Sequence, residues 1–142
     1  MSYRRNQSRR PSSRDEMSDL VRQITANSSK LLSKETSEDI ELFLNLSEKF
    51  GEKCSKRIST SQIRAIFTLV KRLSDNYNVS KKDLNLLRPK LAYQKGRFPA
   101  LGPLTQVLDH LIKNVKDNST LKGFKEFFEA IIAYHKAYGG KE

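Results

Sequence analysis

The stretch from Gly102 to Tyr138, GPLTQVLDHLIKNVKDNSTLKGFKEFFEAIIAYHKAY, decides the fold. Its apolar residues recur at steps of three and four, once up to Val115 and again from Leu121, which is the spacing of two amphipathic helices. Pro103 suits the first turn of the first helix, and Gly139-Gly140 ends the second. Because the polar connector between them is short, we expect antiparallel neighbours.

Further amphipathic segments precede this pair. A helix is predicted from about Glu38 to Phe50, capped by Thr36 or Ser37 and stopped by Gly51. Another is predicted from residues 59–61 to about Asp75. Pro89 is not tolerated deep inside a helix, so we predict a short turn of helix over 81–87 and a separate helix from Pro89 to about Gly96. One kinked helix is the alternative. The sequence predicts an all-α bundle of about five helices.

The first 36 residues differ in composition from the rest. Residues 1–14 hold five Arg and no acid, and they have too few apolar side chains to offset the entropy of ordering. A weak apolar set between Leu20 and Leu32 allows a short docked helix. We therefore predict a mostly disordered Arg/Ser-rich arm over 1–36 and a single helical domain over 37–142.

Length and composition exclude several classes of protein. At 142 residues, 37% of them hydrophobic, the chain has room for one domain and a modest core. No apolar run approaches the roughly eighteen residues that cross a bilayer, so we expect no membrane partner. The single cysteine, Cys54, allows no internal disulfide and suits the cytoplasm. Its cationic neighbours are expected to lower its pKa, although we interpret it as incidental to function.

Positive charge is concentrated in one part of the chain. Residues 51–97 hold twelve Lys and Arg against three acids, whereas residues 15–50 are net acidic and residues 98–142 are close to neutral. Such a local excess indicates a polyanionic partner, because phosphates would neutralise it and release condensed counterions.

Two segments carry the candidate contacts. Around the 59–75 helix, Arg57 precedes Ser61, Arg64, Thr68 and Lys71, and the first turn offers hydroxyls and free amides as an anion site. In the segment that follows Pro89, Tyr93 could stack on a base, or it could lie at the edge of the core. For any single residue the alternative is a solvated charged face. The predicted RNA-binding residues are Arg57, Ser61, Gln62, Arg64, Lys71, Arg88, Lys90, Lys95 and Arg97.

Signals for catalysis or a cofactor are weak. Neither His110 nor His135 has an acid or cysteine at metal-ligand spacing, and no phosphate-binding glycine loop is present. We expect His135 to be a satisfied histidine at the core edge, so we predict no catalytic residue, metal or cofactor. Three alternatives stay open: a helical DNA-binding regulator using the 57–72 helix, a small ribonuclease using His135, and a scaffold whose basic face docks an acidic protein.

Three motifs, ISTSQIR (58–64), LRPKLAYQKGR (87–97) and FEAIIAYHKAYGGK (128–141), together resemble the small subunit of type III-A CRISPR effector complexes. The resemblance covers about residues 50–142. It implies an all-helical, non-catalytic subunit, present in several copies, that lines the groove where guide RNA pairs with target RNA. It also implies a large subunit and backbone subunits as partners. Family contacts would map onto Arg64, Arg88, Lys90 and Arg97, with Gln62 and Lys71 as weaker candidates.

Overall fold

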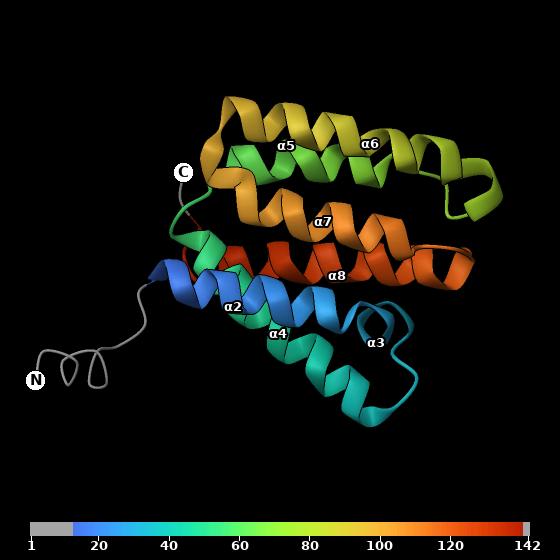
Figure 1. Cartoon of the computed structure of the whole chain (residues 1–142), viewed down its shortest axis with the longest axis horizontal. Coiled ribbons are helices and arrows are strands. Elements are labelled where there is room, and N and C mark those ends of the chain that lie inside the picture. The colour runs from blue at the N-terminus through green and yellow to red at the C-terminus, as the bar shows by residue number, and fades with distance from the viewer. Residues whose placement is uncertain (1–12, 141–142) are drawn as a thin grey trace, which may run out of the picture.

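The computed structural model describes residues 13–140, which form helices and no β-strand (Figure 1). The predicted all-α fold is confirmed. The helices are α2 (Ser13–Ala26), α3 (Ser28–Ser33), α4 (Ser37–Ser55), α5 (Thr60–Lys71), α6 (Tyr77–Arg97), the 3-10 turn η1 (Pro99–Leu101), α7 (Gly102–Asn114) and α8 (Asn118–Ala137).

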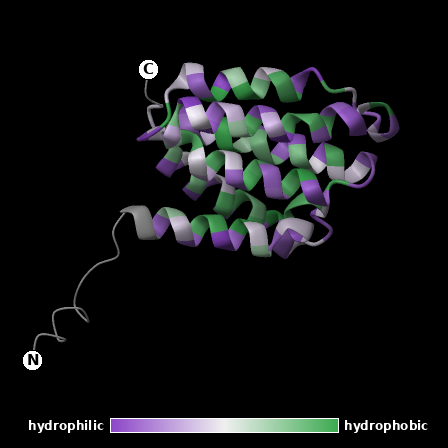
Figure 2. Ribbon diagram, turned by 45° about the horizontal axis from the view of Figure 1, so that its top comes forward, coloured by the Kyte–Doolittle hydropathy of each residue, from purple (hydrophilic) through white to green (hydrophobic). Residues whose placement is uncertain are grey.

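The helices pack in two layers around one core. In one layer α7 lies between α6 and α2, and in the other α8 lies between α5 and α4, while α3 contacts both layers (Figure 1). Apolar and polar residues alternate along the helices (Figure 2), and the buried residues are mostly apolar. The largest buried side chains include Phe50 of α4 and Phe124, Phe127 and Phe128 of α8. The stripes predicted for α7 and α8 therefore form the centre of the core.

The prediction of a mostly disordered arm is wrong for residues 13–33, which form α2 and α3. Met17, Leu20 and Ile24 of α2 are buried, because their three- and four-residue spacing puts them on the face that packs against α7 and α4. Leu31 and Leu32 of α3 are buried as well. A helix with so few apolar residues gains most of its stability from tertiary contacts. The sequence pattern alone therefore did not predict that this segment is folded. The Arg-rich residues 1–12 lie outside the described residues.

Gly51 does not end α4, contrary to the prediction, because the helix continues to Ser55. The glycine is buried where α4 crosses α8, and a Cβ there would lie 2.7 Å from the Cβ of Tyr134 and 2.8 Å from the Ile131 carbonyl oxygen. The missing side chain thus allows close helix packing. Along α4, Phe43, Leu46 and Phe50 are buried, whereas Ile40 and Leu44 are exposed.

The two helices predicted around Pro89 are one continuous helix, α6, as in the single-helix alternative. Proline removes the amide that would bond to the carbonyl of Asn85, but both residues are exposed, so water can satisfy that carbonyl. Leu84, Leu87 and Leu91 are buried on either side of the proline and hold the helix against its neighbours. Within residues 13–140, no helix is both long and apolar enough to cross a bilayer.

Candidate nucleic-acid interface

The α5–α6 pair brings two of the predicted basic segments together. The helices lie against each other and run in opposite directions, joined by residues 72–76 (Figure 1). The start of α5, with Arg57, Ser61 and Arg64, therefore lies at the same end of the bundle as the end of α6, with Lys95 and Arg97. Lys71, at the end of α5, lies at the opposite end.

The first turn of α5, where the sequence predicts an anion site, is partly engaged by its own capping hydrogen bonds. Ser59 Oγ accepts a hydrogen bond from the Gln62 amide at 3.1 Å, and Gln62 Oε1 accepts one from the Ser59 amide at 3.0 Å. This reciprocal capping box engages the Gln62 amide and the Ser59 hydroxyl, which are two of the groups that a phosphate would use. Gln62 therefore caps the helix. The Ser61 hydroxyl is within hydrogen-bonding distance of the Ser59 hydroxyl, with 3.2 Å between the two Oγ atoms. Arg64 remains exposed one turn on.

Arg88 is tied to a carboxylate across the α6–α7 contact. Its Nε donates to Asp109 Oδ1 at 2.8 Å, and Lys113 Nζ lies 3.4 Å from the other carboxylate oxygen. Arg88 is half-buried there, beside a hollow that Lys95 and Gln106 also line. One carboxylate thus neutralises part of the charge of two cations. Of the predicted RNA-binding cations, Arg88 is the one that forms an ion pair within residues 13–140.

The C-terminal end of α6 presents a cation between two aromatic rings. The Arg97 guanidinium carbon lies 4.9 Å from the centroid of the Phe98 ring and 6.0 Å from that of Tyr93. These contacts orient the guanidinium without neutralising it. Tyr93 is 63% exposed, so it does not lie at the core edge, and much of its ring is accessible to solvent beside Arg97. Lys90, one turn earlier, is exposed too.

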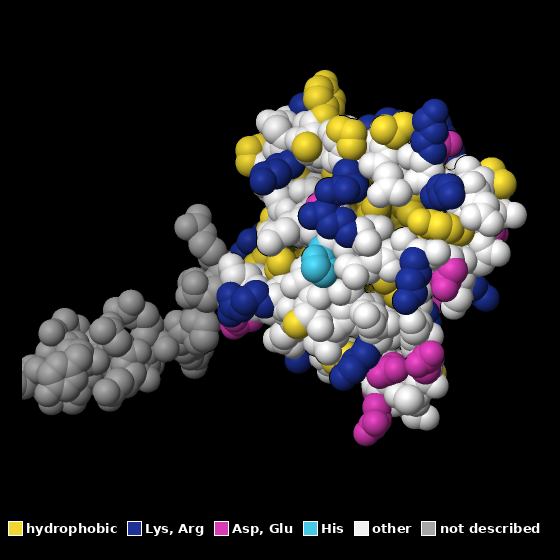
Figure 3. Space-filling view, turned by 45° about the vertical axis from the view of Figure 1, so that its right-hand side comes forward, with side chains coloured by type: hydrophobic (Ala, Val, Ile, Leu, Met, Phe, Trp, Pro, Cys, Tyr) yellow, Lys and Arg dark blue, Asp and Glu magenta, His cyan; other side chains and the backbone are white. Residues whose placement is uncertain are grey.

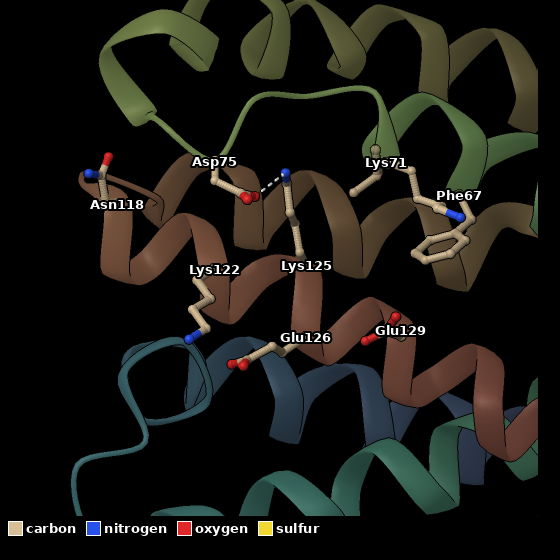
Figure 4. A pocket seen from close by; sticks show the side chains of 9 residues that line it. Phe67, Lys71, Asp75, Asn118, Lys122, Lys125, Glu126 and Glu129 are labelled. Carbon is tan, nitrogen blue, oxygen red and sulfur yellow. Dashed lines mark hydrogen bonds and ion pairs between the residues drawn. The ribbon is translucent and has the colours of Figure 1, made fainter.

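Lys71 belongs to a different surface. Its Nζ lies 5.6 Å from the centroid of the Phe67 ring, at a hollow of about 550 Å³ between α5 and α8 (Figure 4). Lys125 extends toward the 72–76 connector, where it donates to Asp75 at 2.8 Å and lowers the pKa of that carboxyl. The charged residues lining the hollow are balanced in sign: Lys71, Lys122 and Lys125 against Asp75, Glu126 and Glu129. The charged residues of this lining therefore sum to no net positive charge that would favour an anion.

Both histidines have hydrogen-bonding partners. His135 is buried, and its Nε2 donates to the Ile58 carbonyl oxygen at 2.7 Å, joining the end of α8 to the segment before α5. This confirms the predicted satisfied histidine. His110 is half-buried, with Nε2 3.2 Å from Ser28 Oγ. In the described part of the chain, no group of three or more His, Cys, Asp or Glu is placed to hold a metal ion.

The thiol of Cys54 does not have the lowered pKa that the sequence predicts. It is fully buried in α4, and this burial raises the pKa of its thiol to about 12, against a smaller lowering by the nearby Arg57. Loss of hydration disfavours the thiolate more than the neighbouring cation favours it. The prediction of a lowered pKa is wrong, and Cys54 behaves as a small core residue.

Comparisons with known proteins point to one family. Residues 37–141 match the family described as Csm2 Type III-A. The chain is 39% identical over 93 residues to the CRISPR system Cms protein Csm2 of Streptococcus thermophilus, an alignment that covers 60% of this chain and 76% of that protein. No solved structure matches the chain.

Proposed function

Because the chain belongs to the Csm2 family of type III-A CRISPR systems, we propose that it is the non-catalytic, RNA-binding small subunit of a type III-A effector complex. Several copies line the groove in which guide RNA pairs with target RNA, beside the large subunit and the backbone subunits, in the cytoplasm. The subunit has to serve any guide, so it contacts the ribose-phosphate backbone and leaves sequence recognition to base pairing.

The proposal rests on exposed cations of α5 and α6 that form no ion pair within the described residues. Arg64, Lys90 and Arg97 are exposed, and none of them has a carboxylate within ion-pair distance among residues 13–140. Cations without internal partners are repelled by one another and gain most from phosphates. We propose that Arg57 and Lys95 add to this set of contacts and that Tyr93 contributes an exposed ring.

Weak RNA binding with a steep salt dependence is the first expected result. If about four phosphates are neutralised, the affinity for a single-stranded RNA should fall roughly fifty- to a hundredfold between about 50 and 200 mM salt. Fluorescence anisotropy with labelled RNAs of unrelated sequence measures both the slope and any sequence preference. A flat salt response, or strong preference for one sequence, would contradict backbone binding.

Removing one carboxylate should strengthen RNA binding. Asp109→Asn releases Arg88 and Lys113 from their shared partner, so the affinity for RNA is expected to rise about three- to tenfold. The matched control is Asp83→Asn, which changes the net charge equally at an exposed position of α6. Equal gains in the two variants would show that net charge alone is responsible and that Arg88 does not contact RNA.

A further inference from the structure

Two helices carry the chain into the fold ahead of the part that matches the family. Residues 37–141 match the family, whereas α2 and α3 lie within residues 13–33. α2 packs against α7 and α4, and α3 packs against α8 and α4. The apolar side chains that these two helices bury are Met17, Leu20, Val21, Ile24, Leu31 and Leu32. Burial of six such side chains fixes the start of α2 at a defined place in the bundle.

The start of α2 lies at the same end of the bundle as the end of α6. Glu16, near the start of α2, forms an ion pair with Lys53 near the end of α4, shortly before α5 begins. Ser28, which follows α2, is hydrogen-bonded to His110 in the second half of α7, so α2 and α7 run in parallel. The start of α7 in turn follows α6 through η1 (Figure 1). The chain therefore enters the bundle beside the end of α4 and the start of α7.

This end of the bundle carries cations that form no ion pair within residues 13–140. They are Arg57, Arg64, Lys95 and Arg97, and we call them the basic end. One helix, α7, lies between α2 and α6, so the end of α6 is two helix spacings, or roughly 20 Å, from the start of α2. The unpaired positive charge of the bundle thus lies near the point where the chain enters it.

Acids near the start of α2 already have cationic partners. The pairs are Glu16 with Lys53, Asp19 with Arg22 and Glu52 with Lys56. Other acids gather at the start of α4, at the lower edge of the molecule in Figure 3. α4 has 19 residues and is about 28 Å long, so these acids lie at its other end, away from the start of α2. These acids therefore leave positive charge at the start of α2 without a local partner.

The residues that precede α2 are strongly basic. Residues 1–12, which we call the N-terminal tail, hold four Arg and no acid. A tail of this length spans at most about 40 Å, which is twice the roughly 20 Å between the start of α2 and the end of α6. The N-terminal tail is therefore long enough to contact a polyanion that lies on the basic end.

We propose that the N-terminal tail binds phosphates of the same RNA strand that lies on the basic end, with α2 and α3 as its anchor. The proposal rests on the proposed function, because it requires RNA at the basic end. Arginine binds phosphates through charge-assisted hydrogen bonds, and each contact releases condensed counterions. Because the tail is anchored beside the first contact, its own contact is intramolecular, with an effective concentration of about millimolar order.

A strand of phosphates fits this arrangement better than an acidic protein does. The basic end and the N-terminal tail are two separate sets of cations, and a linear polyanion can extend from one to the other. Protein interfaces bury an apolar centre, whereas the tail offers few large apolar side chains, Met1 and Tyr3. The composition of the tail therefore suits phosphates.

Neutralising the N-terminal tail of the full chain tests the contact. The tail variant combines Arg4→Gln, Arg5→Gln, Arg9→Gln and Arg10→Gln. Its affinity for a single-stranded oligouridine of about twenty nucleotides should be about tenfold lower, or more, at about 100 mM salt. The slope of log affinity against log salt should flatten by about 3, since each lost contact with a single strand removes about 0.7. For an oligouridine of about six nucleotides, which the basic end can occupy alone, the loss should stay below about threefold. Fluorescence anisotropy measures all three quantities.

A spacer tests the anchor and leaves every charge in place. A Gly/Ser spacer of about 36 residues between Ser12 and Ser13 lengthens the connection about fourfold, and effective concentration falls with roughly the −3/2 power of length. The affinity for the longer oligouridine should therefore fall about five- to tenfold. The matched control is the same spacer after Glu142, which should change the affinity less than about twofold.

A charge-matched variant separates the N-terminal tail from net charge. It combines Lys30→Gln, Lys81→Gln, Lys116→Gln and Lys122→Gln, at exposed positions of the opposite end of the bundle, where the starts of α6 and α8 meet. This variant should lose less than about threefold in affinity for the longer oligouridine. Equal losses in this variant and in the tail variant would overturn the proposal, because net charge alone would then explain both.

Other outcomes also overturn the proposal. A tail variant that keeps the affinity and the salt slope of the parent chain would show that the N-terminal tail does not contact RNA, and the proposed function would then stand on the basic end alone. Unchanged affinity in the spacer variant would show that α2 and α3 do not act as an anchor for the contact. If neither the parent chain nor the tail variant bound RNA, the proposed function would fail together with this proposal.

Discussion

Gly123→Ala is expected to lower the free energy of unfolding by about 3 kcal/mol or more, which corresponds to a fall in Tm of about 10 °C. Gly123 lies in α8 where the backbone of α3 crosses it. A Cβ at this position would overlap the carbonyl oxygen of Leu32 and would lie 2.7 Å from its carbonyl carbon and 2.9 Å from its Cα. Because the obstacle is backbone, no side-chain rotation relieves it, and α3 has to move away from α8.

Gly96→Ala is the matched control, since it makes the same chemical change within a helix. A Cβ at Gly96 meets nothing within 4 Å, and the position is exposed near the end of α6. Alanine should therefore stabilise the protein by about 0.5–1 kcal/mol through its higher helix propensity. Thermal and urea unfolding followed by circular dichroism measure both changes. A loss of less than about 1 kcal/mol for Gly123→Ala would show that α3 is not pressed against α8.

Reversing three cations on α5 and α6 should nearly abolish RNA binding. Arg64→Glu, Lys90→Glu and Arg97→Glu together remove the uncommitted charges and add three repulsive ones, so the affinity is expected to fall about a hundredfold or more at constant salt. Arg88 is left unchanged, because a glutamate there would face Asp109 and would disturb the α6–α7 contact. The measurement is RNA anisotropy, with the helical circular dichroism signal as the test of folding.

An equal change of net charge elsewhere is the control for this triple variant. Lys30→Glu, Lys49→Glu and Lys122→Glu are exposed positions away from the candidate contacts, and their combined reversal should weaken RNA binding much less. Similar losses in the two triple variants would mean that net charge attracts RNA without a defined surface. Unaltered binding in the Arg64, Lys90 and Arg97 variant would refute the proposed interface.

The candidate site was only partly predictable. The local excess of charge and the helical spacing predicted Arg64, Lys90 and Arg97 as solvent-facing cations. Periodicity is sufficient for this prediction, because a residue off the apolar stripe of a helix faces solvent. The ion pair between Arg88 and Asp109 was not predictable from the sequence. The two residues are 21 positions apart and meet only because α6 packs against α7. Gln62 could have been recognised, since a serine three residues before a glutamine is the local signature of a capping box.

The sequence by itself determined the helical class, the buried stripes of α7 and α8 and the basic middle segment, because these depend on composition and on the spacing of neighbouring residues. Only the tertiary structure decided that α2 and α3 join the core, that α4 continues through Gly51 and that α6 continues through Pro89. In each case a local preference for disorder or for a helix end is outweighed by contacts with another helix, which is distant in the chain for α2, α3 and α4 and adjacent in the chain for α6. Such contacts have no signature within the segment itself.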